Sequence, residues 1–108
     1  MNRIEKIAQN LIAQHLENVK TPEKFTDRET TRAIRDAIIA EEGAINQYET
    51  VVDATTDERV ARVLTSIANE EKAHVGELQK LLAMLLEDEQ GFLDEGAGEV
   101  EDELEDEE

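Results

Sequence analysis

The chain has 108 residues, no cysteine and a formal net charge of −17 at pH 7. Disulfides, thiolate metal sites and iron–sulfur clusters are therefore excluded, and nucleic acid and anionic membranes are poor partners because both attract basic surfaces. No stretch approaches the roughly 18 apolar residues of a membrane span, so we expect a soluble, intracellular protein. The charge is uneven, because 13 acidic and no basic residues lie from Glu87 onward, while the first 86 residues carry only −4.

The N-terminal segment, residues 1–22, is predicted to contain an amphipathic helix. Apolar residues recur at helical spacing from Ile4 to Val19, and Pro22 then interrupts the pattern. We expect this helix to dock on its own bundle or on a neighbouring chain.

The central segment, residues 23–90, is predicted to form two long helices. Thr26 and Glu29 have the spacing of a capping box, which predicts that the first helix starts near Asp27. Its apolar periodicity continues to about Val52.

The second helix follows a short turn at Asp53, Ala54 and Thr55. Thr55 and Glu58 have the spacing of another capping box, so this helix is predicted to run from Thr56 to about Glu87. Two long helices with a tight connection form an antiparallel hairpin.

Both helices carry an inward stripe with alternating steps of four and three residues, as in coiled coils. The stripes mirror each other about Thr56, so folding the hairpin brings Glu41 level with Glu71. The apolar members are Ile34, Ile38, Ile45, Tyr48 and Val52 in the first helix, and Val60, Leu64, Ile67, Leu78, Leu81 and Leu85 in the second. Glu41, Glu71 and His74 are the polar interruptions.

The C-terminal segment, residues 91–108, is acidic and contains three glycines with few apolar residues. Such a composition buries too little apolar surface to offset the entropy of the chain, so we expect an acidic, flexible and disordered tail. Its role is open between attracting cations, binding a partner and keeping the protein soluble.

Glu71 and His74 stand three residues apart, so both side chains can reach one metal ion from one helix face. This Glu-x-x-His spacing is the one that carboxylate-bridged di-iron bundles use. Glu41 and Glu71 face each other in an apolar seam, where burial and like-charge repulsion make it costly for both carboxyl groups to be ionised. A bound cation removes this cost. The di-iron site needs four carboxylates and two histidines, which one hairpin does not supply. We therefore predict an all-α homodimer in which two hairpins complete a four-helix bundle.

Carboxylate and imidazole ligands without sulfur admit Fe, Mn, Zn and Co. Two adjacent metals suit the oxidation of Fe(II) by O₂, because each iron can give one electron. Tyr48 lies two turns from Glu41 on the same face and can hydrogen-bond a ligand near the site.

Residues Phe25 to Gln90 resemble the encapsulated ferritin family, the ferritin-like cargo of encapsulin shells. The motifs that carry the resemblance are AEEGAINQYE from Ala40, DATTD from Asp53 and EEKAHVGE from Glu70. The resemblance implies a half-ferritin chain whose ferroxidase centre holds two Fe ions at a dimer interface. It also implies metal ligands at Glu41, Glu71 and His74, with Glu71 bridging the irons and Tyr48 beside them as a catalytic residue.

The resemblance further implies dimers joined into an open ring, commonly a decamer, and iron oxidation for storage or detoxification. The expected location is the cytoplasm, inside an encapsulin nanocompartment, with the shell protein as a partner. Two alternatives stay open at this point. One is a rubrerythrin-like peroxidase, and the other is a helical assembly or adaptor module whose polar seam fixes its register without metal.

Overall fold

The computed structural model describes residues 2–18 and 23–105, and these residues form only α-helices and turns, which confirms the all-α prediction. None of the helices in this part of the chain is both long and apolar enough to cross a membrane. The helices are α1 (Arg3–Asn18), α2 (Asp27–Ala54), α3 (Glu58–Leu85) and α4 (Glu89–Glu105).

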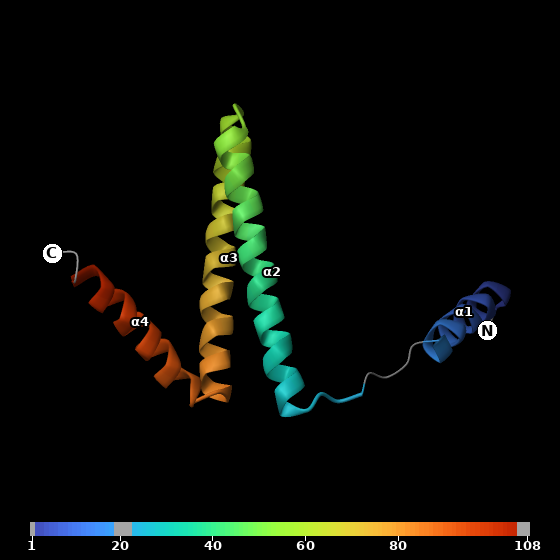
Figure 1. Cartoon of the computed structure of the whole chain (residues 1–108). Coiled ribbons are helices and arrows are strands. Elements are labelled where there is room, and N and C mark those ends of the chain that lie inside the picture. The colour runs from blue at the N-terminus through green and yellow to red at the C-terminus, as the bar shows by residue number, and fades with distance from the viewer. Residues whose placement is uncertain (1, 19–22, 106–108) are drawn as a thin grey trace.

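Helices α2 and α3 form the predicted antiparallel hairpin (Figure 1). The predicted capping box is present, because the Glu29 N–H donates to Thr26 Oγ1 at 3.2 Å and the Thr26 N–H donates to Glu29 Oε1 at 3.1 Å. Both helices have 28 residues, so each is about 42 Å long and the two ends of the hairpin are level. Each helix differs from its predicted bounds by about two residues.

The second predicted capping box, between Thr55 and Glu58, is not formed. Instead Asp57 caps α3, since its carboxylate accepts the Arg59 N–H at 2.9 Å, while Thr55 Oγ1 accepts the Asp57 N–H at 3.1 Å. The carboxylate of Asp57 is closer in sequence to the free amides of α3 and takes the capping position. Its hydrogen bonds from the side chain and backbone of Arg59 hold the pKa of Asp57 below its usual range.

The chain is open rather than compact, and α1 and α4 project away from the hairpin (Figure 1). Its radius of gyration is 22.8 Å, whereas a compact chain of this length has about 13 Å. The expected N-terminal helix is present as α1, but its apolar residues Ile4, Ile7, Leu11 and Ile12 are all exposed. Within the described residues α1 therefore has no docking surface, and Val19 to Pro22 lie outside them.

The expectation of a disordered C-terminal segment is corrected, because α4 extends from Glu89 to Glu105. The expectation considered only how little apolar surface the segment buries. Glutamate has a high helix propensity, and the apolar residues from Leu93 to Leu104 follow steps of four, three and four residues, which is helical spacing. Residues 106–108 lie outside the described part of the chain.

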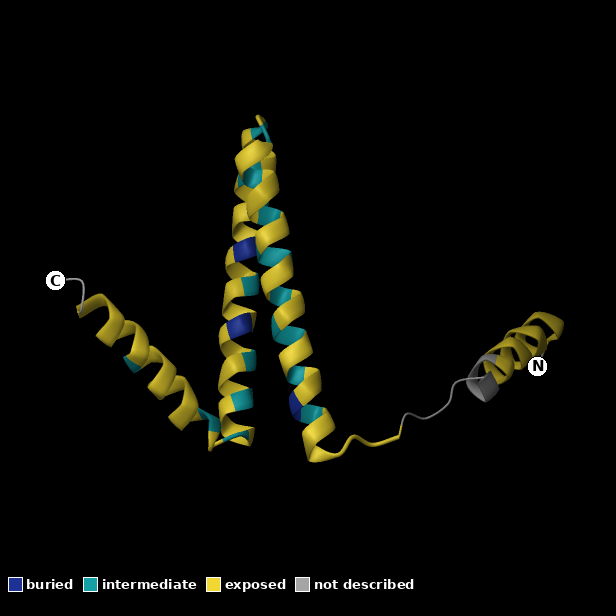
Figure 2. Ribbon diagram, in the orientation of Figure 1, coloured by how far each residue is buried: buried dark blue, intermediate teal, exposed yellow. Residues whose placement is uncertain are grey.

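The hairpin contact is narrower than predicted, and among the described residues only Thr31, Ala68 and Val75 are buried (Figure 2). No large side chain in the described part of the chain is fully buried. On α3 the stripe that faces α2 consists of Ala61, Leu64, Ala68, Glu71, Val75, Leu78 and Leu82, all buried or half-buried. Leu64, Glu71 and Leu78 were predicted correctly, and Ile67, another predicted inward position, is also half-buried.

The remaining predicted inward positions of α3 are mostly exposed in the single hairpin. Val60, His74, Leu81 and Leu85 form a second stripe beside the first, with Leu81 at 44% and Leu85 at 49% exposure. A helix of a bundle has an apolar face wide enough for two neighbours, and a hairpin covers only part of it. The second stripe is therefore a surface on which another helical layer can pack.

Ala68 is 1% exposed and lies on the stripe of α3 that faces α2. Replacing it with leucine adds three carbon atoms at this buried position, so Ala68→Leu should lower the free energy of unfolding by about 1–3 kcal/mol. Urea unfolding at a fixed protein concentration measures this change. The control is Ala73→Leu on the exposed face of the same helix, expected within about 0.5 kcal/mol of the unchanged protein. Equal effects at both positions would contradict the assigned packing.

Candidate metal centre

The structure brings the three predicted ligand residues together midway along the hairpin. Glu41 comes from α2, and Glu71 and His74 come from successive turns of α3. One ligand atom from each residue lies within 4.8 Å of the other two, with Nδ1 of His74 3.7 Å from Glu41 Oε2 and 3.5 Å from Glu71 Oε2. These distances are long for hydrogen bonds, so the three groups surround a space rather than bind one another.

Side-chain direction explains why His74 joins the two glutamates. Side chains of a helix lean toward its N-terminus, and α2 and α3 run in opposite directions. Glu41 therefore leans down the hairpin while His74 leans up it, and the two meet between their backbone levels. The mirror pattern had placed His74 level with Ile38, one turn away from Glu41.

Glu41 has the least satisfied polar atom of the centre. Its Oε2 has no contact with solvent and no hydrogen-bond partner, although the side chain as a whole is 29% exposed. A buried carboxylate oxygen without a donor is costly, and a bound cation removes this cost directly. Glu71 is 20% exposed, while His74 is 49% exposed and forms the open edge of the centre.

The donor set fits a transition-metal ion. Two carboxylates and one imidazole, without sulfur, match the ligand preferences of iron, manganese and zinc. Three protein ligands would leave a bound ion with coordination positions for a second metal, more protein ligands or a small molecule. Along the described residues, this is the one cluster of three acidic or histidine ligands with such geometry.

Tyr48 is half-buried on the same face of α2 as Glu41. Seven residues separate the two, which is about 10 Å along the helix axis. The structure therefore does not bring Tyr48 into the ligand cluster, and a catalytic role for it stays a prediction.

One contact near the centre was not predicted from the sequence. Lys72 Nζ donates to Glu49 Oε2 at 3.2 Å and links α3 to α2. Mirror symmetry about Thr56 does not pair Glu49 with Lys72. Both long side chains lean toward the N-terminus of their own helix, which brings their ends together across the hairpin. Both are about half exposed, so this ion pair contributes little stability.

Comparison with known proteins identifies relatives of this architecture. The family profile described as Rubrerythrin matches residues 2–100. The chain is 48% identical over 61 residues to the ferritin-like-encapsulin shell fusion protein of Pyrococcus furiosus, covering 56% of this chain and 18% of that protein. It is 41% identical over 64 residues to the encapsulin nanocompartment cargo protein EncC of Myxococcus xanthus, covering 59% of this chain and 49% of that protein. The chain thus spans less than half the length of either relative.

The fold has a solved counterpart. The crystal structure of the encapsulated ferritin domain from Pyrococcus furiosus matches with a TM-score of 0.74 and 38% sequence identity, covering 80% of this chain and 88% of that one. The expected resemblance to encapsulated ferritins is confirmed in both sequence and fold. With the profile match over nearly the whole chain, the protein belongs to the rubrerythrin family of ferritin-like proteins.

Proposed function

We propose that the protein is a ferroxidase that oxidises Fe(II) to Fe(III) with O₂ at a centre formed between two copies of the chain. The observation that carries this proposal is the convergence of Glu41, Glu71 and His74 around a buried carboxylate oxygen that has no partner. Membership of a family of ferritin-like proteins favours iron over the other metals that this ligand set accepts.

A second copy of the hairpin supplies what one copy lacks. The di-iron arrangement of ferritin-like bundles uses four carboxylates and two histidines, and two copies of Glu41, Glu71 and His74 provide this number. The exposed stripe of Val60, His74, Leu81 and Leu85 favours the same arrangement, because His74 at the open edge of the centre belongs to it. Pairing two such stripes about a two-fold axis would bury apolar surface and join the two half-centres.

The chemistry follows from the charges of the ligands. Two Fe(II) ions held side by side lose one electron each, and O₂ takes up both electrons together with two protons. Glu41 and Glu71 supply anionic oxygen, which favours the more highly charged Fe(III). His74 supplies a neutral nitrogen and holds the ions on the α3 side. We also propose that the hydroxyl group of Tyr48 donates a hydrogen bond to a ligand at the rim of the metal centre.

Removal of one carboxylate should abolish oxidation. In Glu41→Gln the side chain keeps its size but loses its charge, so Fe(II) oxidation by O₂ should slow at least about 100-fold. Loss of a residue that only supports a metal ligand lowers activity by about 10- to 100-fold, and loss of a ligand itself should cost at least as much. His74→Ala should have a similar effect. The matched control is Glu42→Gln, an exposed neighbour outside the cluster, which should retain the full rate. Absorbance of Fe(III) after mixing with Fe(II) in air measures all three, and unchanged rates in both ligand variants would contradict the proposal.

Metal should also hold the two copies together. Adding Fe(II) without oxygen, or Zn(II), should increase the dimer fraction, because the ions neutralise carboxylates that otherwise repel across the interface. A chelator should reverse this increase. In Glu41→Gln the metal-free dimer should be as stable as in the unchanged protein or more so, and the response to metal should be lost. Sedimentation velocity with elemental analysis measures both quantities. If the dimer fraction does not change with metal and the purified protein contains no metal, the results would favour the helical adaptor module instead.

A peroxidase is the second candidate, because the matching profile bears the name Rubrerythrin. The chain contains no cysteine for a rubredoxin-type iron site, so the electrons for peroxide reduction would come from elsewhere. Anaerobic Fe(II) protein treated with H₂O₂ or with O₂ separates the two functions. The ferroxidase proposal requires that oxidation with O₂ is the faster of the two.

Both curated relatives carry encapsulin in their names. We propose that this protein likewise works inside an encapsulin shell in the cytoplasm, as a ring of dimers. In extracts of its native cells it should then sediment with shell-sized particles. Recovery only as a free small oligomer would contradict this part of the proposal.

A further inference from the structure

Helix α4 is poorly stabilised by its own sequence. Its 17 residues include three glycines, and a helix of this length is marginal in water even with good helix formers. Its acidic residues repel one another at i,i+4 spacing, as in Glu95–Glu99 and Glu99–Glu103. The last turn contains no basic residue and ends at Glu105, which opposes the helix dipole. Contact with a surface outside α4 would therefore stabilise this helix.

The face that needs this support is visible in the structure. Leu93, Ala97, Val100 and Leu104 form one apolar stripe along α4, and the three larger side chains are each 60% exposed. Acidic residues border the stripe, namely Asp94, Glu101 and Glu103. The surface that covers it must combine apolar side chains with positive charge.

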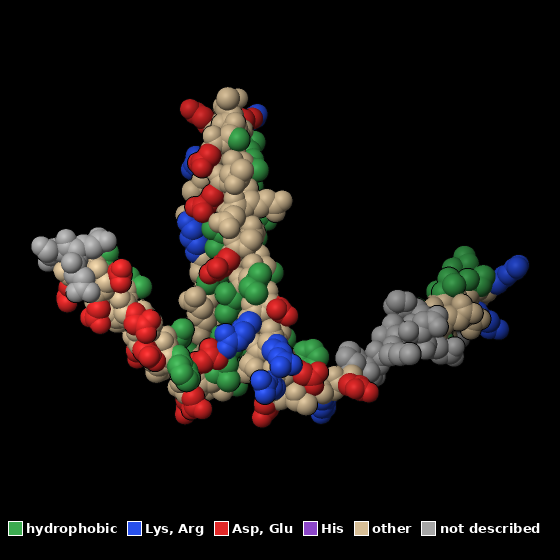
Figure 3. All heavy atoms as spheres, viewed as in Figure 1, with side chains coloured by type: hydrophobic (Ala, Val, Ile, Leu, Met, Phe, Trp, Pro, Cys, Tyr) green, Lys and Arg blue, Asp and Glu red, His purple; other side chains and the backbone are tan. Residues whose placement is uncertain are grey.

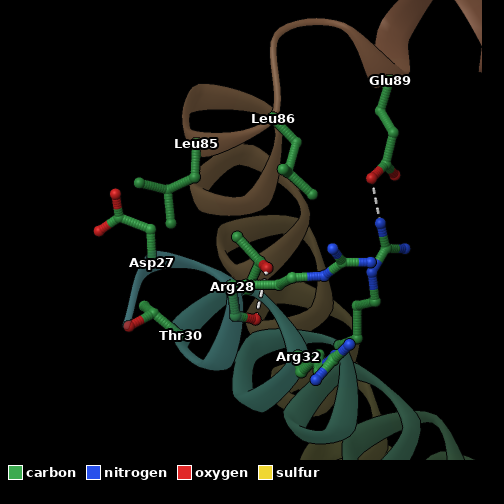
Figure 4. Close-up of a pocket in the computed structure, with 9 residues that line it drawn as sticks. Asp27, Arg28, Thr30, Arg32, Leu85, Leu86 and Glu89 are labelled. Atoms are coloured by element: carbon green, nitrogen blue, oxygen red, sulfur yellow. Dashed lines mark hydrogen bonds and ion pairs between the residues drawn. The ribbon is translucent and has the colours of Figure 1, made fainter. Parts of the chain in front are cut away.

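The hairpin offers such a surface at its open end. Arg28, Arg32 and Arg35, here called the arginine patch, lie within about 60° of one another around α2, since they are four and three residues apart. Figure 3 shows basic side chains gathered at this end of the hairpin, and acidic ones along α4. The patch lines a cavity of about 650 Å³ to which Leu85 and Leu86 at the end of α3 also contribute, together with two carboxylates, those of Asp27 and Glu89 (Figure 4).

Part of this patch is unpaired in the single chain. Arg35 forms an ion pair with Glu89 in the first turn of α4, while Arg28 and Arg32 pair with no carboxylate among the residues that the structure describes. From Glu89 onward α4 leads away from the hairpin (Figure 1). Leu93, the first residue of the stripe, lines a cavity with Arg35 of its own chain, while the rest of the stripe, from Ala97 to Leu104, continues along the part of α4 that leads away (Figure 1).

We propose that α4 of one copy docks on the arginine patch of a second copy. Two α4 helices do not suit each other, because neither has a basic residue and their acidic borders would repel. Helix α1 is a weaker candidate, because Arg3 and Lys6 are offset in it by Glu5 and Glu17. The arginine patch satisfies both requirements, because Arg28 and Arg32 supply positive charge beyond the Arg35–Glu89 ion pair and Leu85 and Leu86 supply apolar contact.

This contact is separate from the proposed metal centre. The patch lies at the end of the hairpin, and its nearest member, Arg35, is six residues from Glu41, about 9 Å along α2. The two contacts together would link pairs of chains into a larger assembly. The α4 contact does not rest on the proposed function, and each can fail without the other.

Charge reversal tests the contact. The unchanged protein should have a native mass above that of a dimer, and Arg28→Glu with Arg32→Glu should weaken this association at least about tenfold. The matched control is Arg59→Glu with Arg62→Glu, which makes the same change in charge at the other end of the hairpin and should keep the larger mass. Sedimentation velocity measures mass, and the iron oxidation rate per subunit should be unaffected in both variants. If none of these proteins oxidises iron, the unchanged one included, the result contradicts the ferroxidase proposal and leaves the docking proposal standing.

The order of α4 gives a second readout. The chain has no cysteine, so Glu95→Cys carries a spin label at a single exposed position. The label should be restrained in the otherwise unchanged protein and should become mobile when the arginine patch is reversed. If instead Ile4→Asp with Leu11→Asp in α1 frees the label and the patch variant does not, then α1 holds α4 and the proposal is overturned.

A mixing experiment identifies the docking as intermolecular. Glu101→Arg with Glu103→Arg reverses the acidic border of α4. This variant and the patch variant should each fail to form the larger assembly alone, and a mixture of the two should recover it. No recovery in the mixture, with both variants shown to be helical by circular dichroism, would overturn the proposal. So would an unchanged native mass in the patch variant.

Discussion

One carboxylate oxygen of Glu41 lies in the seam between α2 and α3 without solvent and without a hydrogen-bond donor. An anionic oxygen in such a position raises the free energy of the hairpin unless a cation approaches it. Glu71 Oε2 and His74 Nδ1 point into the same space and offer no hydrogen bond at normal length. A cation at this oxygen would thus serve both the stability of the fold and its proposed chemistry.

The narrow core connects this centre to assembly. Two helices contact along one stripe, so only Ala68 and Val75 supply buried apolar side chains in the described part of the chain. A single hairpin with so little core is marginal, because burial of apolar area is the main favourable term in folding. In the proposed dimer the second stripe of α3 would be covered by the partner, and the partner would also complete the ligand set. Folding, association and metal binding would then be coupled equilibria.

The distribution of charge adds a second organising feature. Helix α4 starts at the same end of the molecule as the arginine patch (Figure 3), yet among the described residues Arg35 and Glu89 are the only members of the two that form an ion pair. An acidic helix keeps a protein soluble and disfavours contacts with its own kind. Its apolar stripe is exposed to solvent. A partner that covers the stripe and tolerates the acidic residues beside it must have a basic surface. The docking proposed for α4 follows from this restriction.

The sequence alone determined most of the central hairpin. Periodicity and the Thr26–Glu29 capping box set α2 and α3 to within about two residues, and Glu-x-x-His with a mirrored glutamate indicated the cluster of Glu41, Glu71 and His74. These features are local, or follow from one two-fold relation about the turn, so spacing along the chain is enough to find them. The family resemblance rested on the same residues.

Only the tertiary structure decided which side of each stripe is covered. It showed that Ala68 and Val75, rather than Val60 and Leu81, face α2, because the crossing of two helices selects one line from a wider apolar face. It also showed that α4 is helical and that Lys72 reaches Glu49. Packing angle, side-chain direction and the balance of weak terms in an acidic helix all depend on three-dimensional neighbours, which periodicity does not encode.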